Sequence, residues 1–213
     1  PTWRSLETGF ALLQLLVRTD AMPYKSKKTL FAADFAATLV GAFDTRDHRE
    51  RQSLMSTLHL FYTTLRARRP LIRTEMSLAL RTFARAASRG EDAREAEPQP
   101  AHAAVAHLIN VLASILAGAA QLKEEHVAIF KHTLLPLHLP ASLQSYHPQL
   151  RACLGVFVRK LPEAGRLASD WVLRHWPRQS TSKQVLLLDE LSEVLLMDRS
   201  APQWLSGGPS GGA

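Results

Sequence analysis

The sequence predicts an all-α fold built from paired helices. Its apolar residues recur at intervals of three and four, which places them on one face of a helix. No run of alternating apolar residues bounded by glycine-containing turns supports a sheet. Prolines and polar stretches divide the chain into short lengths that repeat in a similar style. The clearest helical patterns are Leu54, Leu58, Phe61, Leu65 and then Val105, Leu108, Leu112, Ile115, Ala119.

The predicted helices follow one another with short joints. Prolines 70, 148, 162 and 177 lie at these joints, where a missing amide hydrogen is tolerated. Asp47 is a plausible cap for the helix that follows it, and Ser182 precedes the last helix. The expected ranges are 3–18, 29–43, 48–67, 70–88, 103–119, 123–135, 148–160, 163–175 and 182–196.

Helix pairs that recur roughly every 40 residues are typical of a HEAT or armadillo-like solenoid. The periodicity by itself is also compatible with a compact helical bundle. Residues 1–200 are expected to form one repeat domain, because the helix pairs continue in the same style along its length. Residues 89–102 lack an apolar stripe and are rich in charge and proline, which predicts a mobile loop. The Gly/Ser-rich tail, 201–213, is expected to be disordered.

Composition narrows the class of protein. The chain has 213 residues, of which 46% are hydrophobic and 21% charged, enough for a continuous core. Its longest apolar stretches fall short of the roughly 20 residues that cross a bilayer, so we expect no membrane segment. A single cysteine, Cys153, cannot form an internal disulfide. A cytoplasmic or nuclear location is therefore expected.

The charge is unevenly distributed. The net charge is +7, and residues 1–90 hold 15 Lys/Arg against 7 Asp/Glu, or +8. Such a surface attracts anions without choosing among nucleic acid, acidic lipid and acidic peptide. A nucleic-acid-binding solenoid is one alternative, although aromatic residues make up only 7% and no array of them is interleaved with the basic run as a stacking platform requires. The residues that would carry it are Arg46, Arg49, Arg51, Arg66, Arg68, Arg69 and Arg73.

The sequence offers little for catalysis, so we expect neither an enzyme, a cofactor nor a metal site. The nine histidines include no His-Glu-x-x-His arrangement, and His132 and His138 fit hydrogen-bonded structural roles. Cys153, between apolar neighbours, fits the core better than a nucleophile. Glu124 and Glu125 are adjacent on a helix, so their side chains diverge by about 100° and cannot flank a scissile bond.

Three blocks of sequence carry a resemblance to a known family. They are Phe-Asp-Thr-Arg-Asp-His-Arg-Glu-Arg (43–51) leading into Thr-Leu-His (57–59), Leu-Lys-Glu-Glu-His (122–126) leading into Leu-Leu-Pro-Leu-His (134–138), and Tyr-His-Pro-Gln-Leu (146–150). In their order and spacing they resemble the B-prime regulatory subunits of protein phosphatase 2A. The similarity spans about residues 3–196.

The resemblance implies a curved array of HEAT-like repeats that docks on the scaffold and catalytic subunits of the phosphatase and has no catalytic activity. It also implies a groove between repeats that binds short acidic motifs of the form Leu-x-x-Ile-x-Glu in substrates. Carried over to this chain, the peptide-binding residues are His59, Tyr62, Arg69, Arg73, Val111, Ile115, Lys123 and His126.

The chemistry of these positions suits the role. Val111 and Ile115 are four residues apart, on one helical face, and can wall an aliphatic pocket. Lys123 and His126 are three apart and can jointly meet a carboxylate, while Arg69 and Arg73 add donors and positive field. Each position also has a plain structural interpretation, as a core residue or a solvated helix surface.

Two departures from the family weaken the expectation. The family usually has arginine directly after the histidine of Thr-Leu-His, whereas this chain has Leu60, and losing a charged hydrogen bond costs roughly 1.5–3 kcal/mol. Arg66 or Arg68 could compensate for it. The segment before Lys123 is also about one residue shorter than in the family, which could displace Lys123 and His126. A structural fragment that has lost peptide recognition is therefore a further alternative.

Overall fold

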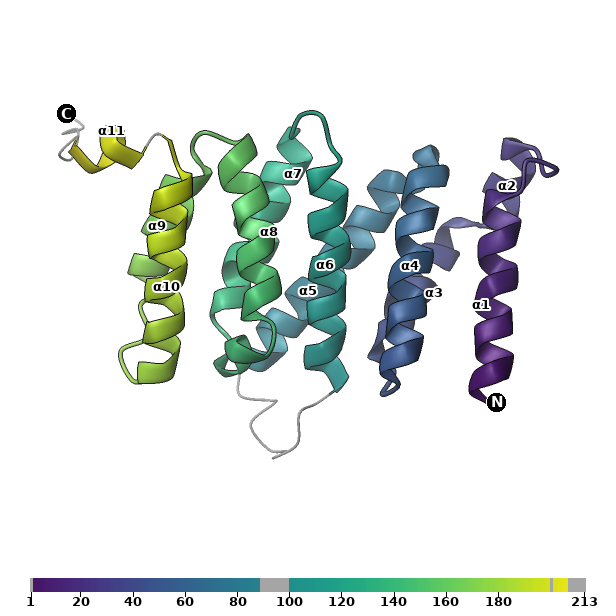
Figure 1. The fold of residues 1–213 in the computed structure, drawn as a ribbon, viewed down its shortest axis with the longest axis horizontal. Helices are drawn as coiled ribbons and strands as arrows, with labels where there is room; N and C mark the ends of the chain where they lie inside the picture. The colour runs from purple at the N-terminus through teal and green to yellow at the C-terminus, as the bar shows by residue number, and fades with distance from the viewer. Residues whose placement is uncertain (1, 89–99, 200, 207–213) are drawn as a thin grey trace.

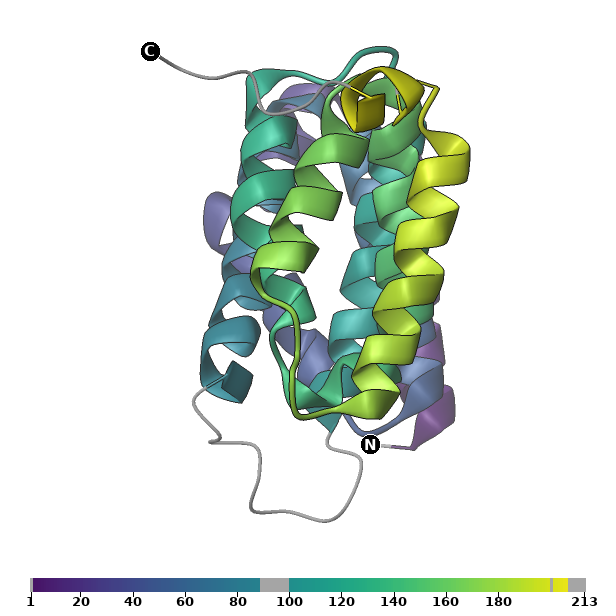
Figure 2. The same ribbon diagram turned by 90° about the vertical axis from the view of Figure 1, so that its left-hand side faces the viewer.

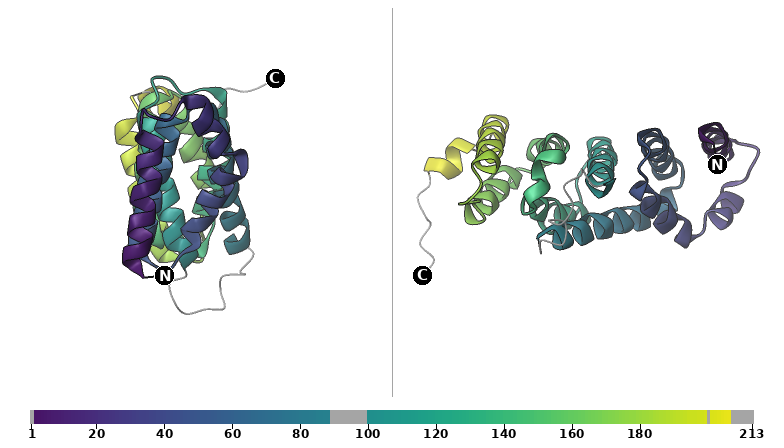
Figure 3. Two further views of the ribbon diagram at one scale, coloured as in Figure 1. Left: turned by 90° about the vertical axis from the view of Figure 1, so that its right-hand side faces the viewer. Right: turned by 90° about the horizontal axis from the view of Figure 1, so that it is seen from below.

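The chain folds into two layers of helices arranged side by side. The computed structural model describes residues 2–88, 100–199 and 201–206, and in these ranges every regular element is a helix. Figure 1 shows one layer standing upright across the view, and the right-hand view of Figure 3 shows this layer nearly end-on with the second layer beneath it. The first layer contains α1 (Trp3–Arg18), α4 (His48–Thr64), α6 (Pro100–Ala117), α8 (His147–Lys160) and α10 (Thr181–Met197).

The second layer covers the back of the first. Its long helix, α5, runs obliquely beneath α4 and α6, and Figure 2 shows α9 and α10 in different layers. Each helix contacts its neighbours in the array, which distinguishes the solenoid from a closed bundle. The predicted all-α repeat fold is confirmed. The helices behind the first layer are α2 (Tyr24–Leu30), α3 (Ala33–Gly41), α5 (Arg69–Ser88), α7 (Glu124–Ile129) and α9 (Ala164–Arg174).

A continuous apolar core joins the layers. The apolar side chains that recur at intervals of three and four residues point between the layers, as their spacing predicts. Burying each one removes on the order of 1.5–3 kcal/mol of unfavourable hydration. Wholly buried examples are Leu58 in α4, Met76 in α5, Leu112 in α6, and Leu154 and Phe157 in α8.

The expected helix 29–43 is two helices. The chain breaks at Phe31, whose φ of −98° and ψ of 72° lie outside the helical region. The Phe31 ring instead packs edge-on against Phe61, with centroids 4.6 Å apart. A buried aromatic contact with another helix therefore outweighs one more helical turn.

Helix α2 was not expected from the sequence, because Tyr24–Leu30 has no apolar stripe. Tertiary hydrogen bonds hold it instead. The Lys27 ammonium donates to the Val17 carbonyl (2.8 Å), and the Tyr24 hydroxyl accepts from the Ala67 amide (3.0 Å). Local periodicity cannot report contacts of this kind.

The expected helix 123–135 changes form part-way along. Helix α7 ends at Ile129 and continues as a π-helical turn, η3 (Phe130–Leu134), and a 3₁₀ turn, η4 (Leu135–His138). Pro136 has no amide hydrogen and its ring crowds the preceding turn, so the regular hydrogen-bond ladder cannot pass through it. The same segment is thus longer and less regular than predicted.

Helix ends differ in smaller ways. Asp47 caps α4 as predicted, accepting from the Arg49 amide at 2.8 Å. Helix α10 starts before Ser182, and Ser180 caps it instead. The expected helix 48–67 ends at Thr64, beyond which Leu65 is buried and η2 (Arg66–Arg68) turns the chain.

The two segments expected to lack structure are partly helical. Residues 100–102 of the predicted mobile loop belong to the first turn of α6, and 89–99 lie outside the described residues. The prediction of disorder from residue 201 is wrong for the six residues of α11 (Ala201–Ser206). Ala201 is buried there, and the Trp204 indole donates to Asp198 Oδ2 (3.0 Å). Residues 207–213 lie outside the described ranges.

Candidate functional site

A groove of about 820 Å³ lies where α4 gives way to α5 and α6 to α7. Both junctions lie at the upper edge of the array in Figure 1. Seven of the eight predicted site residues line it, namely His59, Tyr62, Arg69, Arg73, Ile115, Lys123 and His126. The structure therefore brings these side chains together, whereas their part in binding stays a prediction.

Arg73 lies at the centre of a hydrogen-bonded group in this groove. One terminal nitrogen donates to the Tyr62 hydroxyl (2.6 Å), and the other forms an ion pair with Glu125 Oε1 (2.7 Å). The guanidinium holds the pKa of Glu125 below its usual value, so the carboxylate stays ionised. Arg73 is buried while Glu125 is exposed. The Arg73 charge is thus already committed to a carboxylate of the protein.

Arg69 closes the end of α4. Its Nε donates to the Tyr62 carbonyl (2.8 Å), and a terminal nitrogen donates to the Thr63 carbonyl (3.1 Å). Carbonyls in the last turn of a helix lack helical partners and carry partial negative charge, so a guanidinium stabilises them. The group also lies 5.2 Å from the centroid of the Tyr62 ring. Arg69 thereby fixes Tyr62 in the groove wall.

His126, which is expected to meet a carboxylate together with Lys123, is a neutral ring in the structure. Its Nδ1 accepts from the Lys123 amide (2.9 Å), so a neutral ring carries its proton on Nε2. Burial, together with the nearby Arg73 charge, lowers the pKa of His126. The pair expected to meet a carboxylate is thus one exposed ammonium, Lys123, beside a neutral imidazole that can still donate a hydrogen bond.

Val111 does not line this groove. It is only 1% exposed and lies in the core, at the edge of a neighbouring pocket of about 600 Å³. That pocket adjoins the groove, because His59, Thr63 and Ser114 line both. Leu60, which stands where the family usually has arginine, also lines the neighbouring pocket.

The two arginines proposed to replace the missing one lie in different places. Arg66 is exposed and lines the groove. Arg68 instead donates to the Lys28 carbonyl (3.0 Å), beside α2. Compensation by Arg68 is therefore excluded by its position, and Arg66 remains available. Arg18, from the end of α1, lies on the wall of the pocket that contains Leu60.

Lys160 is a supporting residue that the sequence did not indicate. Its ammonium donates to the carbonyls of Leu116 (2.9 Å), Ala117 (2.6 Å) and Ala119 (2.6 Å) at the end of α6. These bonds fix the loop that carries Lys123. A lysine at the end of a helix gives no signal in the sequence, because its partners are 41 to 44 residues away.

Most arginines of the basic run in the first half of the chain already have partners within the protein. Arg49 pairs with Asp47 (2.8 Å) and lies 4.7 Å from the Trp3 ring. Arg51 donates to the Thr45 carbonyl, and Arg68, Arg69 and Arg73 have the partners described above. Guanidinium groups held in this way are poorly placed to follow a phosphate backbone. The nucleic-acid alternative therefore depends mainly on the exposed Arg46, Arg49 and Arg66.

Groups with potential reactivity are used for packing. Cys153 is wholly buried, which raises the pKa of its thiol to about 12 and leaves it protonated. His138 is buried as well and contacts Leu135 O (2.8 Å) and Glu190 Oε1 (2.9 Å), in agreement with its expected structural role. In the described part of the chain, no three metal-ligating side chains form a cluster. None of the helices there combines the length and apolarity of a membrane span.

Comparison with known proteins identifies the family. The family model for the protein phosphatase 2A regulatory B subunit (B56 family) matches residues 1–201. The chain belongs to the B56 family. The resemblance indicated by the three sequence blocks is thereby confirmed.

Curated relatives of the B56 family agree with this membership. The chain is 34% identical to the B′ theta isoform of the 57 kDa regulatory subunit from Arabidopsis thaliana, over 92% of this chain and 37% of that protein. It is 32% identical to the 56 kDa regulatory subunit delta 2 isoform from Schizosaccharomyces pombe, over 91% of this chain and 29% of that protein. The chain thus spans about a third of the length of the relatives it matches.

Proposed function

We propose that this B56-family chain is a non-catalytic targeting part of protein phosphatase 2A that captures short acidic peptides in the groove between α4, α5, α6 and α7. The relatives are named regulatory subunits of that phosphatase. The observation that carries the peptide proposal is the convergence of seven family-matched side chains on one groove. Its partners are then the scaffold and catalytic subunits and substrates with Leu-x-x-Ile-x-Glu-like segments, in the cytoplasm or nucleus.

The groove offers the groups that such a peptide needs. Ile115 supplies an aliphatic wall, while the exposed Lys123 ammonium and the neutral His126 ring supply donors for a carboxylate. Arg66 adds a second exposed cation at the rim. Arg73 acts differently, because it is bound to Glu125 and Tyr62 and shapes the wall. Recognition of the acidic residue therefore depends mainly on Lys123.

Calorimetry with a Leu-x-x-Ile-x-Glu peptide tests this assignment. We expect the Lys123→Met variant to bind about tenfold more weakly, since one charged hydrogen bond contributes roughly 1.5 kcal/mol or more. Lys131→Met is the matched control, because Lys131 lies about two turns further along, in η3, and does not line the groove. Equal affinities of the two variants, or no binding by the wild-type chain at several hundred micromolar peptide, would contradict the groove proposal.

Co-precipitation with the scaffold and catalytic subunits tests the other half of the proposal. We expect the chain to retain both subunits and to release bound substrate, but not the subunits, when excess peptide is added. If the chain binds the peptide but does not retain the phosphatase subunits, the groove proposal stands and the targeting role is contradicted.

A further inference from the structure

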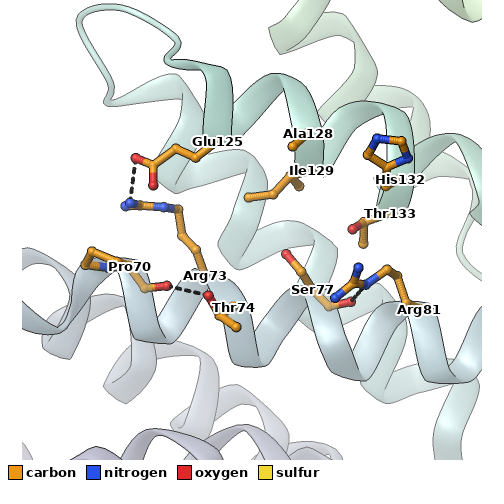
Figure 4. Close-up of a pocket in the computed structure, with 10 residues that line it drawn as sticks. All are labelled: Pro70, Arg73, Thr74, Ser77, Arg81, Glu125, Ala128, Ile129, His132 and Thr133. Atoms are coloured by element: carbon orange, nitrogen blue, oxygen red, sulfur yellow. Dashed lines mark hydrogen bonds and ion pairs between the residues drawn. The ribbon is translucent and has the colours of Figure 1, made fainter.

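Glu125 is the one carboxylate among the described residues that line the groove, where it lies with the cations Arg66, Arg69, Arg73 and Lys123. Its Oε1 accepts a hydrogen bond from a terminal nitrogen of Arg73 at 2.7 Å. Figure 4 shows this bond between α7 above and α5 below. The bond to Arg73 and, more weakly, the charge of Lys123 lower the pKa of Glu125, so its carboxylate is ionised. A carboxylate of the protein itself therefore occupies part of the cationic surface that a peptide acid would use.

The two partners of this ion pair differ in how freely they can move. The Arg73 side chain is 9% exposed, and its other terminal nitrogen donates to the Tyr62 hydroxyl at 2.6 Å, which fixes the guanidinium. The Glu125 side chain is 43% exposed. Beyond the pair lies a second cavity of about 250 Å³, between α5 and the α7–η3 segment, which Glu125 and Arg73 also line. Rotation about the Glu125 side-chain bonds can thus carry its carboxylate away from Arg73 into solvent.

Exchange of one carboxylate for another avoids the main cost of breaking the pair. A largely buried guanidinium without a counter-charge is unfavourable, so Arg73 is expected to keep a carboxylate partner. When a ligand carboxylate replaces Glu125, Arg73 stays paired and the released Glu125 carboxylate regains water. An ion pair that is partly exposed contributes little to stability, so a ligand can compete for Arg73.

We infer that Glu125 is an internal competitor of the peptide's acidic residue, which displaces Glu125 from Arg73 when the groove is filled. The inference deepens the proposed function and rests on it for the identity of the ligand. Arg73 then binds the peptide directly in the complex, after the exposed Lys123 has attracted its carboxylate. Glu125 thereby weakens the capture of acidic peptides and leaves the affinity for a neutral peptide unchanged.

Calorimetry with a Leu-x-x-Ile-x-Glu peptide is the first arm of the test. We expect Glu125→Gln to bind about fivefold more tightly than the wild type, because a neutral amide oxygen competes less well for Arg73 than a carboxylate does. Glu124→Gln is the matched control, since both glutamates lie in the first turn of α7 while Glu124 is exposed and does not line the groove. It removes the same charge and should change the affinity by less than about twofold.

A second peptide, in which glutamine replaces the motif glutamate, shows whether Arg73 is the point of competition. Without a carboxylate, this peptide has nothing to exchange for Glu125. The gain of about fivefold in Glu125→Gln should therefore disappear. An equal gain for both peptides would mean that Glu125 acts on the groove as a whole, and would overturn the inference.

Propionate tests access to Arg73 without the peptide. The Nε–H signal of Arg73 is followed by NMR in the whole chain during a propionate titration, with chloride at equal ionic strength as the reference. We expect the half-saturating concentration to be about fivefold lower in Glu125→Gln than in the wild type and in Glu124→Gln.

The outcomes separate this inference from the proposed function. Propionate shifts that are equal in Glu125→Gln and Glu124→Gln, or peptide binding that Glu125→Gln weakens or leaves unchanged, overturn the competition. If no peptide binds while propionate distinguishes the variants, the groove proposal fails and the exchange at Arg73 is supported.

Discussion

At the scale of single residues, the groove is governed by which charges are already paired. Arg73 forms an ion pair with Glu125, and His126 is neutral. The acidic residue of a bound peptide would therefore contact Lys123 and Arg66 first. Because Leu60 stands where the family usually has arginine, the edge of the groove has one cation fewer. The Leu60 side chain lines the adjoining pocket beside His59, and His59 lines both cavities.

Restoring that arginine tests how much the substitution matters. We expect Leu60→Arg to tighten binding of an acidic peptide by roughly 10- to 100-fold, the range of one charged hydrogen bond. Calorimetry is the measurement, and Leu60→Gln controls for polarity without charge. No difference between the two variants would show that position 60 does not reach the ligand and that Arg66 or Arg18 already supplies the contact.

At the scale of elements, helix ends are stabilised by residues from other helices. Lys160 of α8 closes the end of α6 with three hydrogen bonds, and Asp198 lies against Gly165 at the start of α9. Both contacts join successive repeats. They hold the connecting loops, including the loop before Lys123, at fixed positions relative to the helices.

Removing the Lys160 ammonium should loosen the end of α6. We expect Lys160→Met to lower the free energy of unfolding by about 1.5–3 kcal/mol. The amides of Gly118 and Ala119, which bond within this turn, should exchange faster with solvent. Hydrogen exchange measures this directly, and Arg159→Met, a neighbouring exposed position, is the control. Unchanged exchange would mean that water replaces the ammonium without loss.

Two helical glycines should respond oppositely to alanine. A Cβ at Gly165 would lie 2.7 Å from Asp198 Cγ, so Gly165→Ala should lower the free energy of unfolding by about 1–3 kcal/mol. A Cβ at Gly9, inside α1, would meet no described atom within 4 Å apart from its chain neighbours and its own helical backbone, so Gly9→Ala should raise the free energy of unfolding by about 0.5–1 kcal/mol. Denaturant unfolding compares them, and stabilisation by both variants would show that Asp198 can move away.

At the scale of the whole molecule, one buried group of charges joins the later repeats. Glu190 of α10 accepts from the Nε2 atoms of His138 and His147, both at 2.9 Å, and all three residues are at most 3% exposed. His138 also donates through Nδ1 to Leu135 O, so both of its nitrogens carry protons. Despite the cost of burial, Glu190 raises the pKa of His138, and the two histidines lower the pKa of Glu190 to about 2.

These shifts predict how the group responds to pH. The carboxylate contributes stability above its unfolded pKa of about 4.5, and this is lost as the pH falls towards 2. The His138 contribution is complete below about 6.5 and is lost as the pH rises through the raised pKa. The stabilisation should therefore be greatest between about pH 4.5 and 6.5.

Substituting the shared carboxylate tests this group. Glu190→Gln should lower the free energy of unfolding by about 3 kcal/mol near pH 6 and flatten its pH dependence, because a buried histidine loses its counter-charge. Urea unfolding across pH 4–8 is the measurement. Glu193→Gln, which breaks the exposed pair with Arg151, should cost less than about 1 kcal/mol. Parallel pH profiles for wild type and Glu190→Gln would refute the ionised state of the group.

The sequence by itself determined the helical class, the paired repeats and the family, and it named seven side chains that share one groove. The helical class and the pairing of helices depend on residues close together in the chain, whose spacing fixes a helical face. The seven side chains lie between residues 59 and 126 and were named through the resemblance to the family. Only the tertiary structure decided that α2 forms, that Arg66 and not Arg68 faces the groove, and that Val111 lies in the core. It also decided the charge states, because Arg73 meets a carboxylate 52 residues away and His126 is desolvated by distant helices. Contacts of that kind depend on how the layers pack, which local periodicity does not encode.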